Sequence, residues 1–154
     1  MNYAEEIGKI LIKKGLTIST TESCTGGLLS SKLTDVSGSS AYIRLNLVTY
    51  ANEAKEQMLG VIIDKDGVVS ENCAFQMAKG LYELTKSDIC VSTTGIAGPT
   101  GGTDIKPVGL MYSAIYTKDK YKTYKIQVDS KLSRIKIKEK FTEKVLENIY
   151  NFIK

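Results

Sequence analysis

A glycine-containing turn between an extended segment and a helical pattern constrains the fold of this chain more than any other stretch. Residues 15–20 before the turn alternate apolar and polar side chains and are rich in β-branched residues, which predicts a half-buried strand. After the turn, residues 20–27 (TTESCTGG), leucines recur at helical spacing to about Leu33. A strand that leads directly into a helix is the building unit of α/β folds.

The rest of the chain repeats this alternation of helices and strands. Helical spacing predicts further helices over residues 3–14, 53–59, 71–84 and 133–153, and extended patterns predict strands over residues 41–50, 88–94, 109–116 and 121–128. Expected caps are Gly15, Asn52 and Ser70, and Gly80 inside a helix indicates close packing. This order predicts one α/β domain over residues 1–154, a three-layer αβα sandwich around a mixed β-sheet.

Composition and charge exclude several classes of protein. The chain has 154 residues, of which 42% are hydrophobic, and it has neither an apolar run of about 18 residues nor a signal-peptide pattern, so we expect a cytoplasmic protein without a membrane partner. The net charge of +4 comes largely from lysines near the C-terminus. These lysines are interleaved with apolar residues, as on the solvated face of an amphipathic helix, so nucleic acid is not an expected partner.

The absence of histidine limits the chemistry that this chain can perform. With no histidine, Ser-His-Asp and Cys-His catalysis are excluded within one chain, as is every histidine-ligated metal site. Cys24, Cys73 and Cys90 are far apart in the sequence and form no C-x-x-C motif, so neither a disulfide framework nor a zinc site is predicted. Lysine, tyrosine and carboxylate side chains remain as proton acceptors.

Ser23 is the candidate nucleophile because it lies where the strand ends and the helix begins. The first N–H groups of a helix have no intrahelical partners, and the helix dipole adds partial positive charge, so an anion or a developing oxyanion would be stabilised there. Gly26 and Gly27 would allow the backbone to approach a ligand closely. The same pattern is also typical of a turn that only caps a helix.

Tyr50 and Lys55 are the candidate partners of Ser23. Both lie at a second strand-to-helix junction, and a glycine-rich loop over residues 93–102 follows a third strand. Ligands of open α/β sheets collect beyond the carboxyl ends of the strands, so we expect these three segments to converge on one crevice. The loop lacks the G-K-[ST] ending of a P-loop, so it does not by itself predict phosphate binding.

A lysine base must lose its proton near neutral pH. For Lys55 this requires lowering the pKa by about 3 units, equivalent to ~4 kcal/mol. A helix dipole supplies at most about 1 kcal/mol, whereas burial shifts a lysine by up to ~3–5 units, so Lys55 is predicted to be largely buried. Alternatively, Lys55 stays charged and donates a hydrogen bond, and Tyr50 relays the proton. Cys24, without a histidine to form an ion pair, is predicted to be a small buried packing residue.

Blocks of this sequence resemble the CinA C-terminal domain family, which includes nicotinamide-nucleotide amidohydrolases: residues 21–27 (TESCTGG), 48–55 (VTYANEAK), 69–71 (VSE), and 94–102 (TGIAGPTGG) with 106–109 (KPVG). The resemblance implies pyridine nucleotide salvage by hydrolysis of nicotinamide mononucleotide to nicotinate mononucleotide and ammonia. It implies no metal or cofactor and a homo-oligomer.

The resemblance also implies roles for individual residues. Ser23 would be the nucleophile, Lys55 the general base, and Tyr50 a neighbour that orients or relays the proton. Glu22 would hold the lysine or the serine in place. Backbone N–H groups of residues 24–27 or 95–98 would form the oxyanion hole. The implied substrate-binding residues are Glu22, Cys24, Thr25, Gly26, Gly27, Thr94, Gly95, Ala97, Gly98 and Arg134.

Two positions depart from the family pattern. Asn46 stands where family members commonly have glycine, so we expect a pocket that is narrowed or reshaped, and Lys138 stands where an arginine is common. These departures keep open the alternative of a non-enzymatic nucleotide- or partner-binding domain associated with competence and DNA damage. A third interpretation is a Ser-Lys hydrolase of a different amide.

Overall fold

A five-stranded sheet forms the centre of the computed structural model, which describes all residues from Met1 to Lys154. The strand order is β2-β1-β3-β4-β5. Strands β1 (Ile18–Glu22), β2 (Ile43–Val48) and β3 (Ile89–Gly95) run parallel to one another, whereas β4 (Leu110–Tyr116) and β5 (Tyr121–Gln127) continue the sheet as an antiparallel hairpin. The predicted mixed sheet is therefore confirmed.

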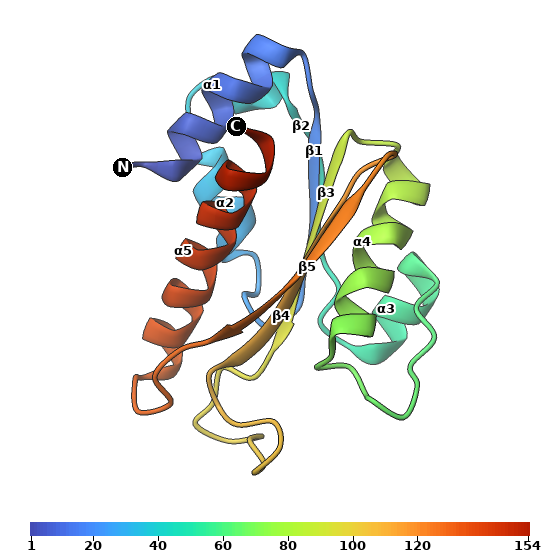
Figure 1. Ribbon diagram of the computed structural model, residues 1–154, viewed down its shortest axis with the longest axis vertical. Coiled ribbons are helices and arrows are strands. Elements are labelled where there is room, and N and C mark those ends of the chain that lie inside the picture. The colour runs from blue at the N-terminus through green and yellow to red at the C-terminus, as the bar shows by residue number, and fades with distance from the viewer.

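Helices cover both faces of this sheet (Figure 1). One face carries α1 (Tyr3–Lys14), α2 (Leu28–Thr34) and α5 (Arg134–Ile153), and the other carries α3 (Asn52–Leu59) and α4 (Glu71–Thr85). A short 3-10 helix, Ser39–Ala41, precedes β2, which begins two residues later than the predicted strand. The predicted three-layer αβα arrangement is confirmed.

The expectation of a half-buried first strand is wrong. All five residues of β1 are buried, because β1 is a central strand between two helical layers. Its polar side chains remain inside by forming hydrogen bonds, since a buried hydroxyl without a partner is costly. The hydroxyl groups of Ser19 and Ser87 lie 2.6 Å apart, and those of Thr21 and Thr49 lie 2.8 Å apart.

Helix ends follow the predicted capping residues with one exception. Gly15 ends α1 in the left-handed conformation, and the Ser70 hydroxyl accepts a hydrogen bond from the Cys73 N–H at the start of α4. Asn52, the expected cap of α3, is instead its first helical residue, and Ala51 occupies the cap position without a side-chain hydrogen bond. The Asn52 side chain is therefore not needed to start the helix.

Gly80 fulfils the predicted role in close packing. It lies on α4 where that helix meets the end of α3, and a β-carbon at this position would overlap the carbonyl group of Leu59. The roughly 1 kcal/mol that glycine costs inside a helix is thus offset by the close approach of the two helices.

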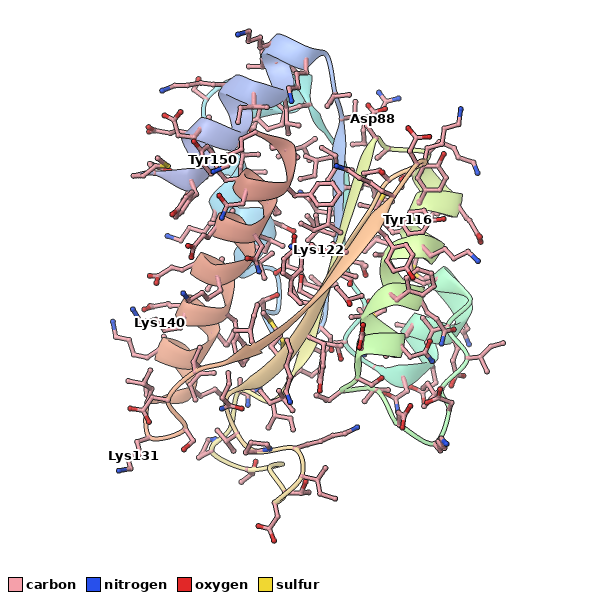
Figure 2. The ribbon with its side chains drawn as sticks, in the orientation of Figure 1. Asp88, Tyr116, Lys122, Lys131, Lys140 and Tyr150 are labelled. Atoms are coloured by element: carbon pink, nitrogen blue, oxygen red, sulfur yellow. The ribbon has the colours of Figure 1, made fainter.

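Lys136, Lys140 and Lys144 of α5 lie on its solvent-facing side. Lys140 projects away from the sheet (Figure 2) and forms an ion pair with Glu143 at 3.4 Å. Lys136 and Lys144 form similar pairs with Glu139 and Glu147. These interactions partly neutralise the basic stretch, in keeping with a solvated helix face. None of the helices is long and apolar enough to span a bilayer.

Candidate active site

The parallel strands β1, β2 and β3 direct their carboxyl ends to one edge of the sheet, and a pocket lies at this edge. Its volume is about 230 Å³, and it is lined by Ser23, Cys24, Tyr50, Gly95, Ile96, Ala97, Gly98, Thr100, Gly101 and Arg134. The predicted convergence of Ser23, Tyr50 and the glycine-rich loop is therefore confirmed. A larger groove of about 730 Å³ lies over α4 and β5, but the Ser23 turn does not line it.

Ser23 is half-buried at the end of β1 and its backbone is held from the neighbouring strand. Its N–H donates to the Thr93 carbonyl oxygen at 3.1 Å and to Thr93 Oγ1 at 3.2 Å. The Ser23 hydroxyl has no hydrogen-bond partner within the chain. The Ser23 backbone is thus held in place, and its unpaired hydroxyl belongs to a residue that lines the pocket.

Backbone N–H groups around the pocket are available for an oxyanion. Those of Cys24, Ala97 and Gly98, which line the pocket, have no acceptor within the chain. The N–H of Thr25, the next residue of the turn, is also without an acceptor. Donors placed beside a nucleophile stabilise the negative charge of a tetrahedral intermediate. Both segments implied as oxyanion-hole candidates therefore provide unpaired donors.

The expectation that Glu22 binds substrate is wrong. Its side chain is fully buried, and its carboxylate accepts hydrogen bonds from the N–H groups of Leu29 at 2.9 Å and Ser30 at 3.0 Å. This carboxylate occupies the start of α2, where the sequence suggested that a ligand anion would bind. Glu22 directly precedes the turn, so its side chain is close enough to the start of α2 to bind the N–H groups there itself.

Lys55 is buried as predicted, with only 1% of its surface exposed. Burial lowers the pKa of Lys55 from its ordinary value of 10.5, while the nearby thiol groups of Cys73 and Cys24 act in the opposite direction. Its Nζ donates to the Tyr50 carbonyl oxygen at 2.9 Å, and no hydrogen bond joins it to Ser23. Lys55 is not among the residues that line the pocket.

Tyr50 and Arg134 form one wall of the pocket. Tyr50 is 56% exposed, and its hydroxyl accepts a hydrogen bond from the Arg134 guanidinium at 3.0 Å. The same guanidinium donates to the Gly98 carbonyl oxygen at 2.7 Å. Arg134 thus joins the β2–α3 segment to the glycine-rich loop and places a positive charge at the pocket.

A second hollow lies beside the Ser23 turn. Its volume is about 320 Å³, and Thr25, Gly26 and Gly27 line it together with Lys138 of α5. A β-carbon on Gly26 would lie 3.4 Å from Lys138 Nζ, so this amine is close to the turn backbone. Gly26 and Gly27 therefore do not line the Ser23 pocket itself.

Two further expectations fail because the side chains point elsewhere. Thr94 is buried, and its hydroxyl donates to the Val68 carbonyl oxygen at 2.6 Å, so it does not contact the pocket. Asn46 does not narrow the pocket, since its side chain lies 2.8 Å from Thr20 Oγ1 on the inner part of the sheet. Positions on a strand alternate between faces, and these two face the helical layers.

Cys24 lines the pocket but is a buried residue, as predicted. Burial raises the pKa of its thiol to about 12, so the thiolate is scarce at neutral pH. No group of three or more histidine, cysteine or carboxylate side chains is placed to hold a metal ion. The sequence analysis assigned no role to Thr93. In the folded chain Thr93 lies on β3, which is parallel to β1, and its hydroxyl accepts a hydrogen bond from the Ser23 N–H.

The comparisons with known proteins identify the family of this chain. The model of the CinA C-terminal domain matches residues 1–153. A competence-damage inducible protein of Halothermothrix orenii is 45% identical, over 97% of this chain and 37% of that protein. A CinA-like protein of Chloroherpeton thalassium is 46% identical, over 95% of this chain and 36% of that protein. The chain spans about a third of the length of these curated relatives.

Solved structures show the same fold over nearly the whole chain. A competence/damage inducible protein of Agrobacterium tumefaciens is 36% identical, with a TM-score of 0.85 over 96% of this chain and 93% of that one. A competence or damage-inducible protein of Enterobacter asburiae is 25% identical, with a TM-score of 0.90 over 99% of this chain and 96% of that one. The chain therefore belongs to the CinA C-terminal domain family.

Proposed function

We propose that this protein hydrolyses the carboxamide of nicotinamide mononucleotide, with Ser23 as the nucleophile. The observation that carries the proposal is the pocket at the carboxyl ends of the parallel strands, where an unpaired serine hydroxyl lies beside unpaired backbone N–H groups. Acyl transfer needs a nucleophile and donors for the oxyanion, and both are present.

The reaction would proceed in two steps. Ser23 Oγ attacks the carboxamide carbon, and the negative charge on its oxygen is stabilised by N–H groups of the Cys24–Thr25 turn or of the Ala97–Gly98 loop. Ammonia then leaves with the proton that the serine has lost. Water hydrolyses the ester on Ser23, so that the amide and one water become a carboxylic acid and ammonia.

Lys55 is the proposed proton acceptor. Burial lowers its pKa, which favours the neutral amine that a base requires. Its hydrogen bond to the Tyr50 carbonyl group directs the amine to the segment that forms the pocket wall. Because apo sites often have catalytic hydrogen bonds that tighten only with substrate, the missing Lys55–Ser23 bond is compatible with this role. The alternative proton path runs through Tyr50, whose hydroxyl faces Arg134.

Arg134 is the proposed contact for an anionic group of the substrate. It lines the pocket, and its guanidinium is held by Tyr50 and Gly98 in a fixed orientation. Guanidinium groups bind carboxylates and phosphates through paired hydrogen bonds. A mononucleotide would thus place its amide near Ser23 and an anionic group near α5.

Release of ammonia from nicotinamide mononucleotide tests the proposal. Wild-type protein is expected to produce ammonia and nicotinate mononucleotide in equal amounts, and Ser23→Ala is expected to produce none above background. Equal rates for the two proteins would exclude Ser23 as the nucleophile. Binding of the mononucleotide without hydrolysis would instead support a non-enzymatic nucleotide-binding domain, which the absence of a Lys55–Ser23 hydrogen bond favours.

A further inference from the structure

The buried Glu22 carboxylate is the end point of a larger set of hydrogen bonds. It accepts five of them: from Thr25 Oγ1 at 2.6 Å, Gly27 N at 3.3 Å, Leu29 N at 2.9 Å, Ser30 N at 3.0 Å and Ser30 Oγ at 2.6 Å. No lysine or arginine forms a salt bridge with it. Three of these partners are backbone N–H groups, which can only donate, and the other two are hydroxyl groups that donate to the carboxylate oxygens.

Each hydroxyl group that bonds to Glu22 has a single proton. This determines the direction of the hydrogen bonds that lead from Ser23 through Thr93 and Thr25 to Glu22. Thr25 must donate its proton to Glu22, because a carboxylate oxygen has none to give. The 2.9 Å contact between Thr25 and Thr93 is therefore a bond donated by Thr93. Thr93 Oγ1 in turn accepts the Ser23 N–H at 3.2 Å. A one-way chain thus runs from the nucleophile's backbone to Glu22.

A second chain reaches the other carboxylate oxygen from the edge of the sheet. Ser30 donates its hydroxyl proton to Glu22, and Ser30 Oγ also lies 3.0 Å from Thr20 Oγ1. Thr20 Oγ1 donates its own proton to Asn46 Oδ1, which lies 2.8 Å away. This chain anchors β2 and does not include Ser23.

We propose that Glu22 is a positioning residue that holds the Ser23 turn through the Thr93–Thr25 chain, while the Asn46–Thr20–Ser30 chain only anchors the neighbouring strand. Because Glu22 binds the start of α2 and the turn at once, it keeps the Cys24 and Thr25 N–H groups beside the serine. The catalytic part of this inference rests on the proposed amidase function; the assignment of the two chains does not.

The test compares two isosteric changes, Thr25→Val and Thr20→Val. Each removes one fully buried hydroxyl group, one from each chain, so both cost the protein a similar set of contacts. Thr25→Ser keeps the hydroxyl and serves as the rescue control. Glu22→Gln places an NH₂ group against hydrogen-bond donors and so tests the role of the carboxylate directly. If this variant does not fold, the threonine variants still test the two hydrogen-bond chains.

Steady-state kinetics with nicotinamide mononucleotide provide the first measurement. We expect Thr25→Val to lower kcat at least tenfold with KM changed less than threefold, Thr25→Ser to recover at least half of the wild-type kcat, and Thr20→Val to stay within threefold of wild type. Equal loss of kcat in both valine variants, or no recovery in Thr25→Ser, would overturn the inference.

Amide hydrogen exchange, followed by NMR, provides a measurement that does not depend on turnover. The Ser23 and Gly27 N–H groups are expected to exchange at least fivefold faster in Thr25→Val than in wild type, and at wild-type rates in Thr20→Val. If wild-type protein shows no turnover, the proposed function fails while the exchange data still test the chains. Identical exchange in the two valine variants would contradict them.

Discussion

Replacement of Lys55 by methionine tests the link between burial and the proposed base. Methionine matches the length of lysine and is well tolerated in apolar surroundings, but it has no amine. At neutral pH the substitution has two opposing effects on the free energy of unfolding. The variant loses the hydrogen bond to the Tyr50 carbonyl group, a loss of about 1–3 kcal/mol, but it gains about 1.4 kcal/mol for every unit by which burial lowers the lysine pKa.

The pH dependence of stability separates these terms. Burial lowers the pKa of Lys55 in the folded protein below 10.5, so the unfolded chain binds the proton more tightly. The contribution of Lys55 to stability therefore rises with pH from the folded pKa up to 10.5, by about 1.4 kcal/mol per unit of lowering. The wild type should gain this free energy relative to Lys55→Met between pH 7 and pH 10.

Urea unfolding of both proteins at pH 7 and pH 10 measures the difference, and ammonia release measures activity. Lys140→Met is the matched control, since it removes the amine of an exposed lysine outside the pocket. We expect Lys55→Met to lose at least about 10²-fold in turnover, the usual contribution of a general base. A difference in unfolding free energy that is the same at both pH values, or full activity in Lys55→Met, would refute the reasoning.

Two further predictions concern packing and the thiol in the pocket. Gly80→Ala should destabilise the protein by about 1–3 kcal/mol in thermal or urea unfolding, because the added methyl group would overlap the Leu59 carbonyl group. This loss is expected although alanine is the better helix former. Unchanged or higher stability would contradict the close contact of α3 and α4. Cys24→Ala should retain activity, and Cys24 in the native protein should resist iodoacetamide at pH 8, because burial raises its pKa to about 12; rapid alkylation, read by mass spectrometry, would argue against this buried state.

Residue patterns alone predict most of the secondary structure and the layered fold. Apolar spacing, glycine caps and turn residues act between near neighbours, so they can be read along the chain. The positions of Ser23, Tyr50 and the glycine-rich loop at one sheet edge follow from a general rule, because parallel strands bring their carboxyl ends together. Burial of Lys55 follows from the chemistry that a lysine base requires, and the structure confirms it.

Contacts between distant segments depend on the tertiary structure. The order of the strands places β1 between β2 and β3, which buries it on both faces and brings Thr93 to the Ser23 backbone. No sequence pattern indicates that Arg134 joins Tyr50 to Gly98, because these residues come from three separate segments.

Glu22 is the clearest example of the difference between what the sequence predicts and what the tertiary structure decides. The family resemblance implied that Glu22 contacts substrate, yet its carboxylate turns inward to the start of α2. The sequence by itself determined which residue types stand at the turn and that the turn joins a strand to a helix. Only the folded chain decided which donors each side chain meets, because hydrogen-bond partners depend on packing between elements and not on their order along the chain.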